Sequence, residues 1–331
     1  MRALFIEPCS TLLFYTALAG LLAFGSAGLW KRLSLRCGLY DEPGERKIHS
    51  SPTSLAGGLT VLIASLPFCL LLFAGWEGSF HWVWLAGLLA FFALGLVDDF
   101  RELGPGVKFL GQLFFIGILT TRLHFELFAP GPLGTLLNFA CSFFWFGLVL
   151  NSLNFIDNMN GLCAGLGVLL AGGFFVAGLI SGATAFLPVM LIFAGALLGL
   201  LPWNYPRAKL FLGDSGSNLV GYIAASGSIL LVNALLQRGT RLTATESHGI
   251  IRALWAFLPA ILILGLPLAD LGSTFLIRLR KGLPLYVGDT NHLSHRLTRK
   301  GLSPQTAVAL LWALSALGLF LGLALLQKIS F

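Results

Sequence analysis

The chain has 331 residues, of which 56% are hydrophobic and 11% are charged, whereas a soluble globular protein carries roughly a quarter charged residues. Its mean hydropathy is +0.86, and apolar blocks of about 20 residues recur along the whole sequence, which excludes an ordinary soluble enzyme, a disordered chain, a disulfide scaffold and a coiled coil. The net charge is +7, but in a chain of this kind the position of the charges is more informative than their sum.

The apolar blocks predict an all-α, polytopic integral membrane bundle of about ten transmembrane helices, formed by residues 1–331 as a single domain. Each span needs about 20 apolar residues because the bilayer core holds no water to satisfy backbone amides. The block 109–122 is the weakest, since it is short and contains Gln112. The predicted spans are 11–30, 59–75, 80–97, 109–122, 132–153, 161–180, 184–203, 216–236, 253–277 and 304–327.

The basic residues predict an orientation. With ten spans, 15 of the 21 Lys and Arg residues lie in the connections after spans 1, 3, 5, 7 and 9. The positive-inside rule places these connections in the cytoplasm and both termini outside. Most acidic residues lie on the same side, which that rule does not require, so we expect a polar site at the cytoplasmic face.

The first cytoplasmic loop runs from Asp41 to Gly58 and contains Arg46, Lys47 and His49. These three side chains suit a phosphate group. The alternative, equally weighted from this segment alone, is a solvated loop that only sets the topology.

The second loop begins with Asp98 and Asp99 at the end of the third span. Adjacent carboxylates at a helix C-terminus repel each other and face the negative end of the helix dipole, so something positive must compensate them. Oxygen ligands favour Mg²⁺ or Mn²⁺ over zinc. The alternative is a polar stop signal that pairs with Arg101 or Lys108.

The third loop carries Asn151, Asn154 and Asp157, which recur every three residues and share one helical stripe. Such groups at a membrane boundary are costly without partners. Helix capping would use one or two of them rather than a stripe, so we favour a functional role. Asn160 and Gly161 then form a turn into the sixth span.

The fourth loop, Pro202 to Asn218, contains Asp214 just before the eighth span. Asp214 and the neighbouring serines either cap that helix or contribute to a site at its N-terminus.

The fifth loop contains Asp289, His292, His295 and Arg296, of which the last three share a helical face. Three donors on one face suit phosphate oxygens, whereas a zinc site is the less favoured alternative because no cysteine accompanies them. Asp270, inside the ninth span, is expected to face a cavity or a partner that the sequence does not identify.

Together, these five segments resemble the polyprenyl-phosphate N-acetylhexosamine-1-phosphate transferase superfamily (glycosyltransferase family 4). They read D-E-P-G-E-R-K-I-H with P-T-S-L-A-G-G, then V-D-D, N-S-L-N-F-I-D, F-L-G-D-S-G-S and D-T-N-H-L-S-H-R-L. The first loop and R-L-R-K-G-L-P look like the branch that transfers GlcNAc-1-phosphate to undecaprenyl phosphate and initiates cell-envelope polysaccharides.

The resemblance implies an enzyme of the plasma (inner) membrane that takes a UDP-sugar and a polyprenyl phosphate, releases UMP and uses Mg²⁺ or Mn²⁺. It implies catalytic roles for Asp98, Asp99 and Asp157, and a metal site at Asp214 with Asn154. The expected substrate-binding residues are Arg46, Lys47, His49, Lys108, Asn151, Asn154, Asn160, His292, His295 and Arg296. Membrane lipid is the expected surrounding, no nucleic acid is expected, and the oligomeric state is open, a homodimer included.

Three positions depart from the family's usual pattern. Asn158 and Asn160 replace a Gly and an Asp in D-G-x-D-G, and Ser294 stands where a His usually precedes His295. The alternatives are the phospho-MurNAc-pentapeptide transferase of peptidoglycan synthesis, whose motif ends in three histidines, and, in another class, a proton-coupled transporter. Carriers place their polar residues near the bilayer midplane, whereas here they lie in loops and at helix ends.

Overall fold

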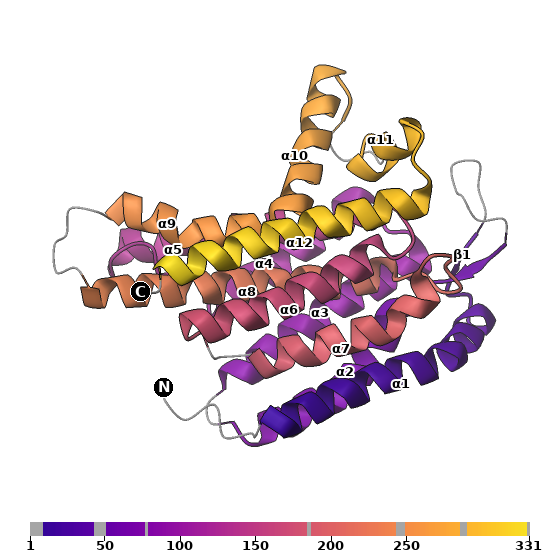
Figure 1. Cartoon of the computed structure of the whole chain (residues 1–331), viewed down its shortest axis with the longest axis horizontal. Coiled ribbons are helices and arrows are strands. Elements are labelled where there is room, and N and C mark those ends of the chain that lie inside the picture. Colours follow the sequence, from indigo (N-terminus) through magenta and orange to yellow (C-terminus); the bar gives the residue numbers. More distant parts are fainter. Residues whose placement is uncertain are drawn as a thin grey trace.

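The computed structural model describes residues 9–42, 51–76, 79–183, 187–242, 249–284 and 290–329. Within these ranges the chain forms an elongated helical bundle with one small sheet (Figure 1), as the apolar blocks predict. The helices are α1 (Cys9–Arg36), α2 (Gly57–Ala74), α3 (Phe80–Arg101), α4 (Pro105–Thr120), α5 (Pro132–Ile156), α6 (Leu162–Ser181), α7 (Leu187–Asn204), α8 (Gly213–Leu242), α9 (Gly249–Ile263), α10 (Gly265–Arg280), α11 (Leu293–Arg299) and α12 (Pro304–Ile329).

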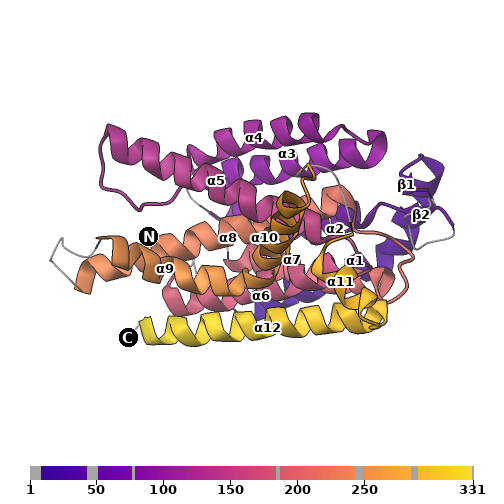
Figure 2. The same ribbon diagram turned by 90° about the horizontal axis from the view of Figure 1, so that it is seen from above.

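Eight helices in the described part of the chain are long and apolar enough to cross a membrane, so the protein is a multi-pass membrane protein. Helix α4 is a shorter apolar helix, in keeping with the weakness of the predicted fourth span. Helices α3, α4 and α5 form one edge of the bundle and α12 lies at the opposite edge (Figure 2).

The predicted ninth span, 253–277, is wrong as a single continuous helix. Helices α9 and α10 meet at a bend of 87°, and α10 projects from the side of the bundle next to α11 (Figure 1). The break falls at Leu264 and Gly265, with Pro267 two residues further on. Glycine weakens a helix and proline lacks the amide that would continue the hydrogen-bond ladder, which accounts for the bend.

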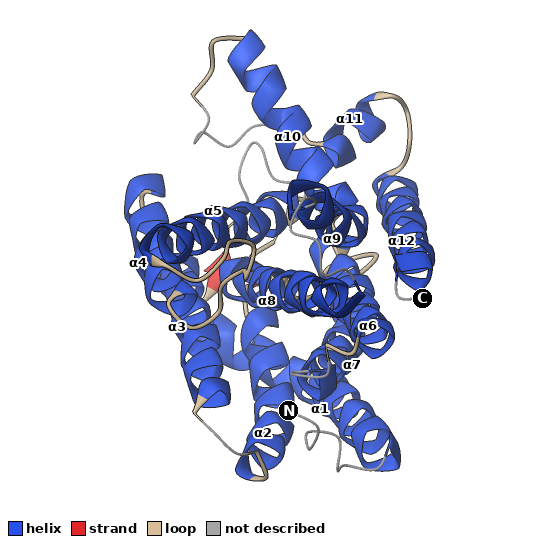
Figure 3. Ribbon diagram, turned by 90° about the vertical axis from the view of Figure 1, so that its left-hand side faces the viewer, coloured by secondary structure: helices blue, strands red, loops and turns tan. Residues whose placement is uncertain are grey.

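Helix α8 lies at the centre of the bundle, enclosed by the surrounding helices (Figure 3). Of its most apolar 18-residue window, 83% is buried, the largest share among the spans. The helix is rich in Gly, Ala and Ser, and small residues allow helices to approach closely in a membrane. Tyr222 in α8 donates a hydrogen bond of 2.7 Å to the carbonyl of Trp84 in α3, which ties the central helix to its neighbour.

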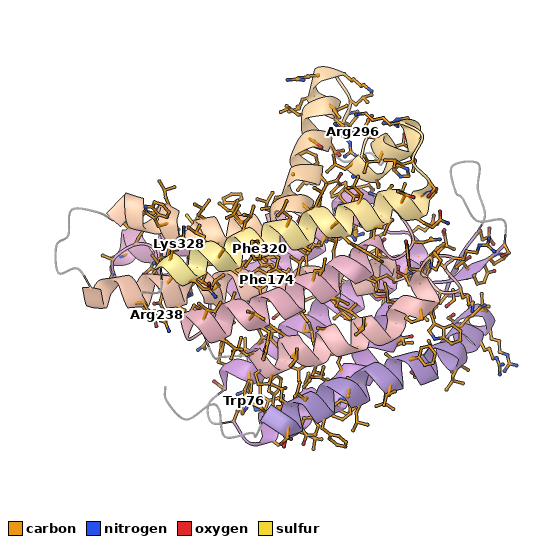
Figure 4. The ribbon with its side chains drawn as sticks, in the orientation of Figure 1. Trp76, Phe174, Arg238, Arg296, Phe320 and Lys328 are labelled. Atoms are coloured by element: carbon orange, nitrogen blue, oxygen red, sulfur yellow. The ribbon has the colours of Figure 1, made fainter. Side chains whose placement is uncertain are left out.

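A two-stranded antiparallel sheet marks one end of the bundle. Strand β1 (Tyr40–Asp41) pairs with β2 (Thr53–Ser54), and Ser54 also bridges to Leu210 in the connection between α7 and α8. Arg296 lies on the projection formed by α10 and α11, whereas Trp76, Arg238 and Lys328 lie in the half of the molecule away from the sheet (Figure 4). The first described turn of α1 and the last of α12 are also in that half (Figure 1).

Candidate active site

The end of α3 and the start of α8 meet beside the sheet, and both carry carboxylates. Gly95 in α3 makes this approach possible, because a Cβ at that position would lie 2.5 Å from the carbonyl oxygen of Asp214. Gly213, immediately before Asp214, has a φ of +76°, a conformation that glycine adopts at little cost. These two glycines therefore bring the predicted Asp98–Asp99 pair next to Asp214.

Lys108 supplies the positive charge that the adjacent carboxylates require. Its Nζ lies 2.8 Å from Oδ2 of Asp98 and 2.8 Å from Oδ1 of Asp214, and it also donates to Oδ1 of Asn154 at 3.3 Å. The Asp98 and Lys108 side chains are 7% and 17% exposed. One cation thus contacts carboxylates and an amide from three other helices, α3, α5 and α8. The pairing of Asp98 with Lys108, which the sequence analysis gave as an alternative, is present.

Asp99 faces the N-terminus of α8. Its Oδ1 accepts a hydrogen bond from the Asp214 amide at 2.7 Å, and its Oδ2 accepts one from the Ser215 amide at 3.0 Å. The first amides of a helix have no partner within that helix, and a carboxylate there also interacts favourably with the helix dipole. These two hydrogen bonds fix the backbone that carries Asp214, and the catalytic role expected for Asp99 stays a prediction.

Asn154 completes the contacts of Asp214 from the predicted stripe on α5. Its Nδ2 donates to Oδ1 of Asp214 at 2.5 Å and to the hydroxyl oxygen of Ser217 at 2.8 Å.

Asp157, which follows the last residue of α5, has its pKa raised well above the usual range by burial and by the negative charges of Asp214 and Asp99, against the opposing effect of Lys108. Asp157 therefore holds its proton to a higher pH than an exposed carboxyl does.

These residues lie in and around a cleft of about 780 Å³. Its walls come from β1 and β2, the ends of α3 and α5, the connection between α7 and α8, α11 and the start of α12. The predicted site residues that line it are Asp98, Asp99, Asn154, Asp157, Asn160, Asp214 and His295. Four of the five loops singled out from the sequence thus contribute predicted residues to one cavity, and Tyr40, Asp41, Ser51 and Thr53 of the first loop line it as well.

Other predicted site residues lie elsewhere. Asn151 donates to the carbonyl of Gly147 in its own helix at 2.8 Å and is not among the residues that line the cleft. His292 is also absent from the lining; it is buried against Asp270, its ring nitrogen Nδ1 2.7 Å from Oδ2. Arg296 donates from Nη1 to the hydroxyl of Ser273 at 3.2 Å.

The phosphate-binding candidates Arg46, Lys47 and His49, together with Asp289 of the zinc alternative, lie outside the described residues.

Two of the three residues that depart from the family pattern are in contact with each other. Ser294 donates a hydrogen bond of 2.5 Å from its hydroxyl to Oδ1 of Asn158. Asn160 donates to the carbonyl of Pro206 at 3.3 Å. Two of the departures thus form a direct link between α11 and the connection from α5 to α6.

Several polar residues of the cleft were not predicted as site residues. Glu102, Tyr205, Arg207 and Gln305 line the cleft, and Ser217 contacts Asn154 from behind. Glu102 and Arg207 are charged residues of the predicted cytoplasmic loops, and their charge is the feature of the sequence that could have identified them as site residues. Nothing in the local sequence separates Tyr205 or Gln305 from an ordinary loop residue.

The donor atoms of the cleft suit a hard cation that binds together with a diphosphate. In the part of the chain that the structure describes, no three His, Cys, Asp or Glu side chains are arranged to hold a metal ion. Mg²⁺ rarely needs such a cage, since it usually takes one or two carboxylates and completes its shell with water and substrate phosphates. Asp214 is 34% exposed, and it lines the cleft with Asn154, so the two together fit that requirement.

The arrangement can neutralise and orient a multiply charged anion. A fixed ammonium group and a carboxylate that can bind a cation lie side by side at the cleft. Preorganised charges of this kind serve phosphoryl transfer, in which positioning and electrostatic stabilisation account for most of the catalysis.

Comparisons with known proteins agree with this chemistry. The sequence profile of glycosyl transferase family 4 matches residues 81–232. The decaprenyl-phosphate N-acetylglucosaminephosphotransferase of Mycolicibacterium smegmatis is 32% identical to the chain over 319 residues, which cover 89% of this chain and 77% of that protein. The probable undecaprenyl-phosphate N-acetylglucosaminyl 1-phosphate transferase of Bacillus subtilis is 30% identical over 289 residues, 85% and 76% of the two chains. The undecaprenyl-phosphate alpha-N-acetylglucosaminyl 1-phosphate transferase of Yersinia pestis is 28% identical over 313 residues, 88% and 78%.

Proposed function

Because the chain belongs to glycosyl transferase family 4, we propose that it transfers GlcNAc-1-phosphate from a UDP-sugar to a polyprenyl phosphate in the membrane. The products are UMP and a polyprenyl-diphosphate-linked sugar that begins a cell-envelope polysaccharide. The observation that carries the proposal is the contact of Lys108 with both Asp98 and Asp214, at the wall of a cleft large enough for a nucleotide-sugar.

The reaction joins two anions, so the protein has to neutralise charge and align the reacting groups. An oxygen of the lipid phosphate forms a bond to the β-phosphorus of the UDP-sugar, and the bond from that phosphorus to the bridging oxygen breaks, which releases UMP. A phosphate monoester has a second pKa of about 6, so the acceptor is largely dianionic at neutral pH and scarcely needs a general base.

Individual residues have distinct tasks in this proposal. Lys108 offsets the negative charge at the reacting phosphates, and Asp98, whose Oδ2 contacts the same ammonium group, orients it. Asp99 holds the first turn of α8 in place. Asn160 and His295, which line the cleft, are placed to contact the donor.

Asp214 and Asn154 would hold Mg²⁺, or Mn²⁺ in its place, when the donor binds. The ion supplies charge neutralisation at the diphosphate. Since Asp214 already shares its Oδ1 with Lys108 and Asn154, the protein contributes few ligands, which matches the preference of Mg²⁺ for substrate phosphates.

The membrane placement follows from the charge distribution. We place the cleft at the cytoplasmic face of the plasma membrane and both termini outside, because most basic residues lie in the connections on the side of the cleft. A UDP-sugar made in the cytoplasm would then reach the cleft directly, and the lipid phosphate would enter from the adjacent leaflet. A homodimer stays a prediction.

The test is UMP release by the purified full-length protein with UDP-GlcNAc, undecaprenyl phosphate and Mg²⁺. A panel of UDP-sugars, including UDP-MurNAc-pentapeptide, separates the GlcNAc-1-phosphate reaction from that of the peptidoglycan branch. Asp214→Ala should abolish turnover. No UMP from any UDP-HexNAc donor would refute the transferase, and full activity of Asp214→Ala would refute the metal assignment.

A further inference from the structure

Asp270 is a buried carboxylate that the proposed reaction does not use. It lies in α10, is 1% exposed, and is not among the residues that line the cleft. A buried charge in an apolar helix is costly unless hydrogen bonds satisfy it. The partners of its two oxygens therefore indicate what it does.

Both oxygens contact the start of α11. Oδ1 accepts a hydrogen bond from the backbone amide of Leu293 at 2.6 Å, and Oδ2 lies 2.7 Å from Nδ1 of His292, which is 4% exposed. An ionised carboxylate can only accept hydrogen bonds, so it requires the proton of His292 to be on Nδ1. A single side chain thus satisfies the first amide of α11 and fixes the ring of its N-cap residue.

Two further contacts hold α11 in the same place. Arg296 donates to Ser273, which lies one turn after Asp270 on α10, and Ser294 donates to Asn158 at the rim of the cleft. Helix α11 has only seven residues, so contacts at its start determine the direction of the whole element. His295, three residues after His292, is the side chain of α11 that lines the cleft.

The bend between α9 and α10 makes these contacts possible. Since α10 leaves the bundle at 87° to α9, it lies next to α11 (Figure 1), and Asp270 is in its second turn. A straight continuation of α9 would point Asp270 in a different direction. The break in the helix and the buried acid are thus parts of one arrangement.

We propose that Asp270 is a positioning residue that acts through His292 and Leu293 to hold α11, and with it His295, against the donor side of the cleft. The expected effect of Asp270 on UMP release rests on the proposed function. The anchoring of α11 by Asp270 does not, and it can be measured without any substrate.

The experiment compares Asp270→Ala and Asp270→Asn with the matched control Thr274→Val. Thr274 lies one turn further along the same buried face of α10 and is 0% exposed, and its hydroxyl has no hydrogen-bond partner among the described residues. Valine keeps its shape, so this variant tests the general sensitivity of the helix. Asn at position 270 keeps an acceptor for the Leu293 amide but presents a donor to Nδ1 of His292.

The first measurement is hydrogen–deuterium exchange of residues 293–299 in the full-length protein without substrate. We expect faster exchange in Asp270→Ala, a smaller change in Asp270→Asn, and wild-type exchange in Thr274→Val. Unchanged exchange in Asp270→Ala, or equal changes in Asp270→Ala and Thr274→Val, would overturn the anchoring.

The second measurement is steady-state UMP release with each substrate varied in turn. Misplacement of a binding group by about 1 Å can cost 10²-fold, so we expect Asp270→Ala to raise the KM for the UDP-sugar by about 10- to 100-fold and to leave the KM for polyprenyl phosphate unchanged. His292→Ala should have a similar effect, and the double variant should be no worse than either, because the two residues act in series.

Additive losses in the double variant, or a wild-type KM for the UDP-sugar in Asp270→Ala, would overturn the positioning role. A wild-type protein that releases no UMP would instead refute the proposed function, and the exchange measurement would still decide whether Asp270 anchors α11.

Discussion

Replacement of Lys108 by Met is the most direct test of the charge arrangement in the cleft. Methionine keeps the length and flexibility of the side chain but removes the ammonium group. It would leave Asp98 and Asp214, each 2.8 Å from Nζ in the native protein, close to one another without the cation that contacts both. Both the fixed orientation of Asp98 and the neutralisation of the phosphates would be lost.

The magnitude follows from the burial of the three groups. Removing one partner of a buried ion pair costs about 3–5 kcal/mol, and the 34% exposure of Asp214 places this case at the lower end of that range. If the loss of about 3 kcal/mol falls on the transition state, kcat/KM decreases by roughly 10²-fold, at 1.36 kcal/mol per factor of ten. Lys108→Arg should be intermediate, because a planar guanidinium cannot place one nitrogen among three oxygens in the same way.

The assay is UMP release under saturating Mg²⁺, with Arg101→Met as the matched control. Arg101 is an exposed residue at the end of α3, so its replacement removes the same formal charge near the cleft without removing the contacts of Lys108. We expect wild-type kcat/KM for Arg101→Met. A Lys108→Met protein within threefold of wild type, or an Arg101→Met protein that is equally impaired, would refute the reasoning.

Three further predictions concern the contacts between α3 and α8. Asp99→Asn should lower kcat by about tenfold, because one of the two hydrogen bonds to the first amides of α8 becomes a contact between two donors. A charge-assisted hydrogen bond of this kind is worth about 1.5–3 kcal/mol. Activity equal to wild type would show that the first turn of α8 does not need the Asp99 carboxylate. Gly95→Ala should reduce turnover while the protein still inserts and folds, since the added Cβ would lie 2.5 Å from the Asp214 carbonyl; full activity in the UMP assay would contradict the need for this close approach. Tyr222→Phe should lose the hydrogen bond to the Trp84 carbonyl and lower the unfolding free energy by about 0.6–1 kcal/mol, as measured by denaturant titration in micelles. The kcat should stay unchanged. A larger effect on kcat than on stability would contradict a purely structural role.

The positions of most helices could be predicted because each span needs a continuous apolar block. The predicted block 132–153, for example, corresponds to α5, Pro132–Ile156, and the block 304–327 corresponds to α12, Pro304–Ile329. The block 253–277 could not be divided in advance, since glycine and proline occur in other blocks without breaking them; Pro67, inside α2, is one case. Whether a helix bends depends on what its two halves pack against, which local sequence does not contain.

The candidate site was predictable in composition but only partly in its contacts. Asp98, Asn154 and Asp214 were identified from clusters of polar residues at helix ends, and the structure brings them together around Lys108. The partner of Asp270 could not be identified, because His292 is 22 residues away along the chain and reaches it only through the bend before α10. Likewise, the hydrogen bond between Asn158 and Ser294 joins loops that no sequence spacing relates.

The burial of α8 has a practical consequence for ligand discovery. The first turn of this helix forms part of the cleft, while the rest of it is the most buried span of the bundle. A compound that occupies the cleft would therefore contact the helix on which α2, α3, α5, α6 and α9 pack, and would stabilise the folded protein against heat. At a concentration 100 times its Kd, such a ligand adds about 2.7 kcal/mol to the unfolding free energy. The melting temperature of the detergent-solubilised protein should thus report donors, acceptors and inhibitors in a single screen, before any turnover assay is available for them.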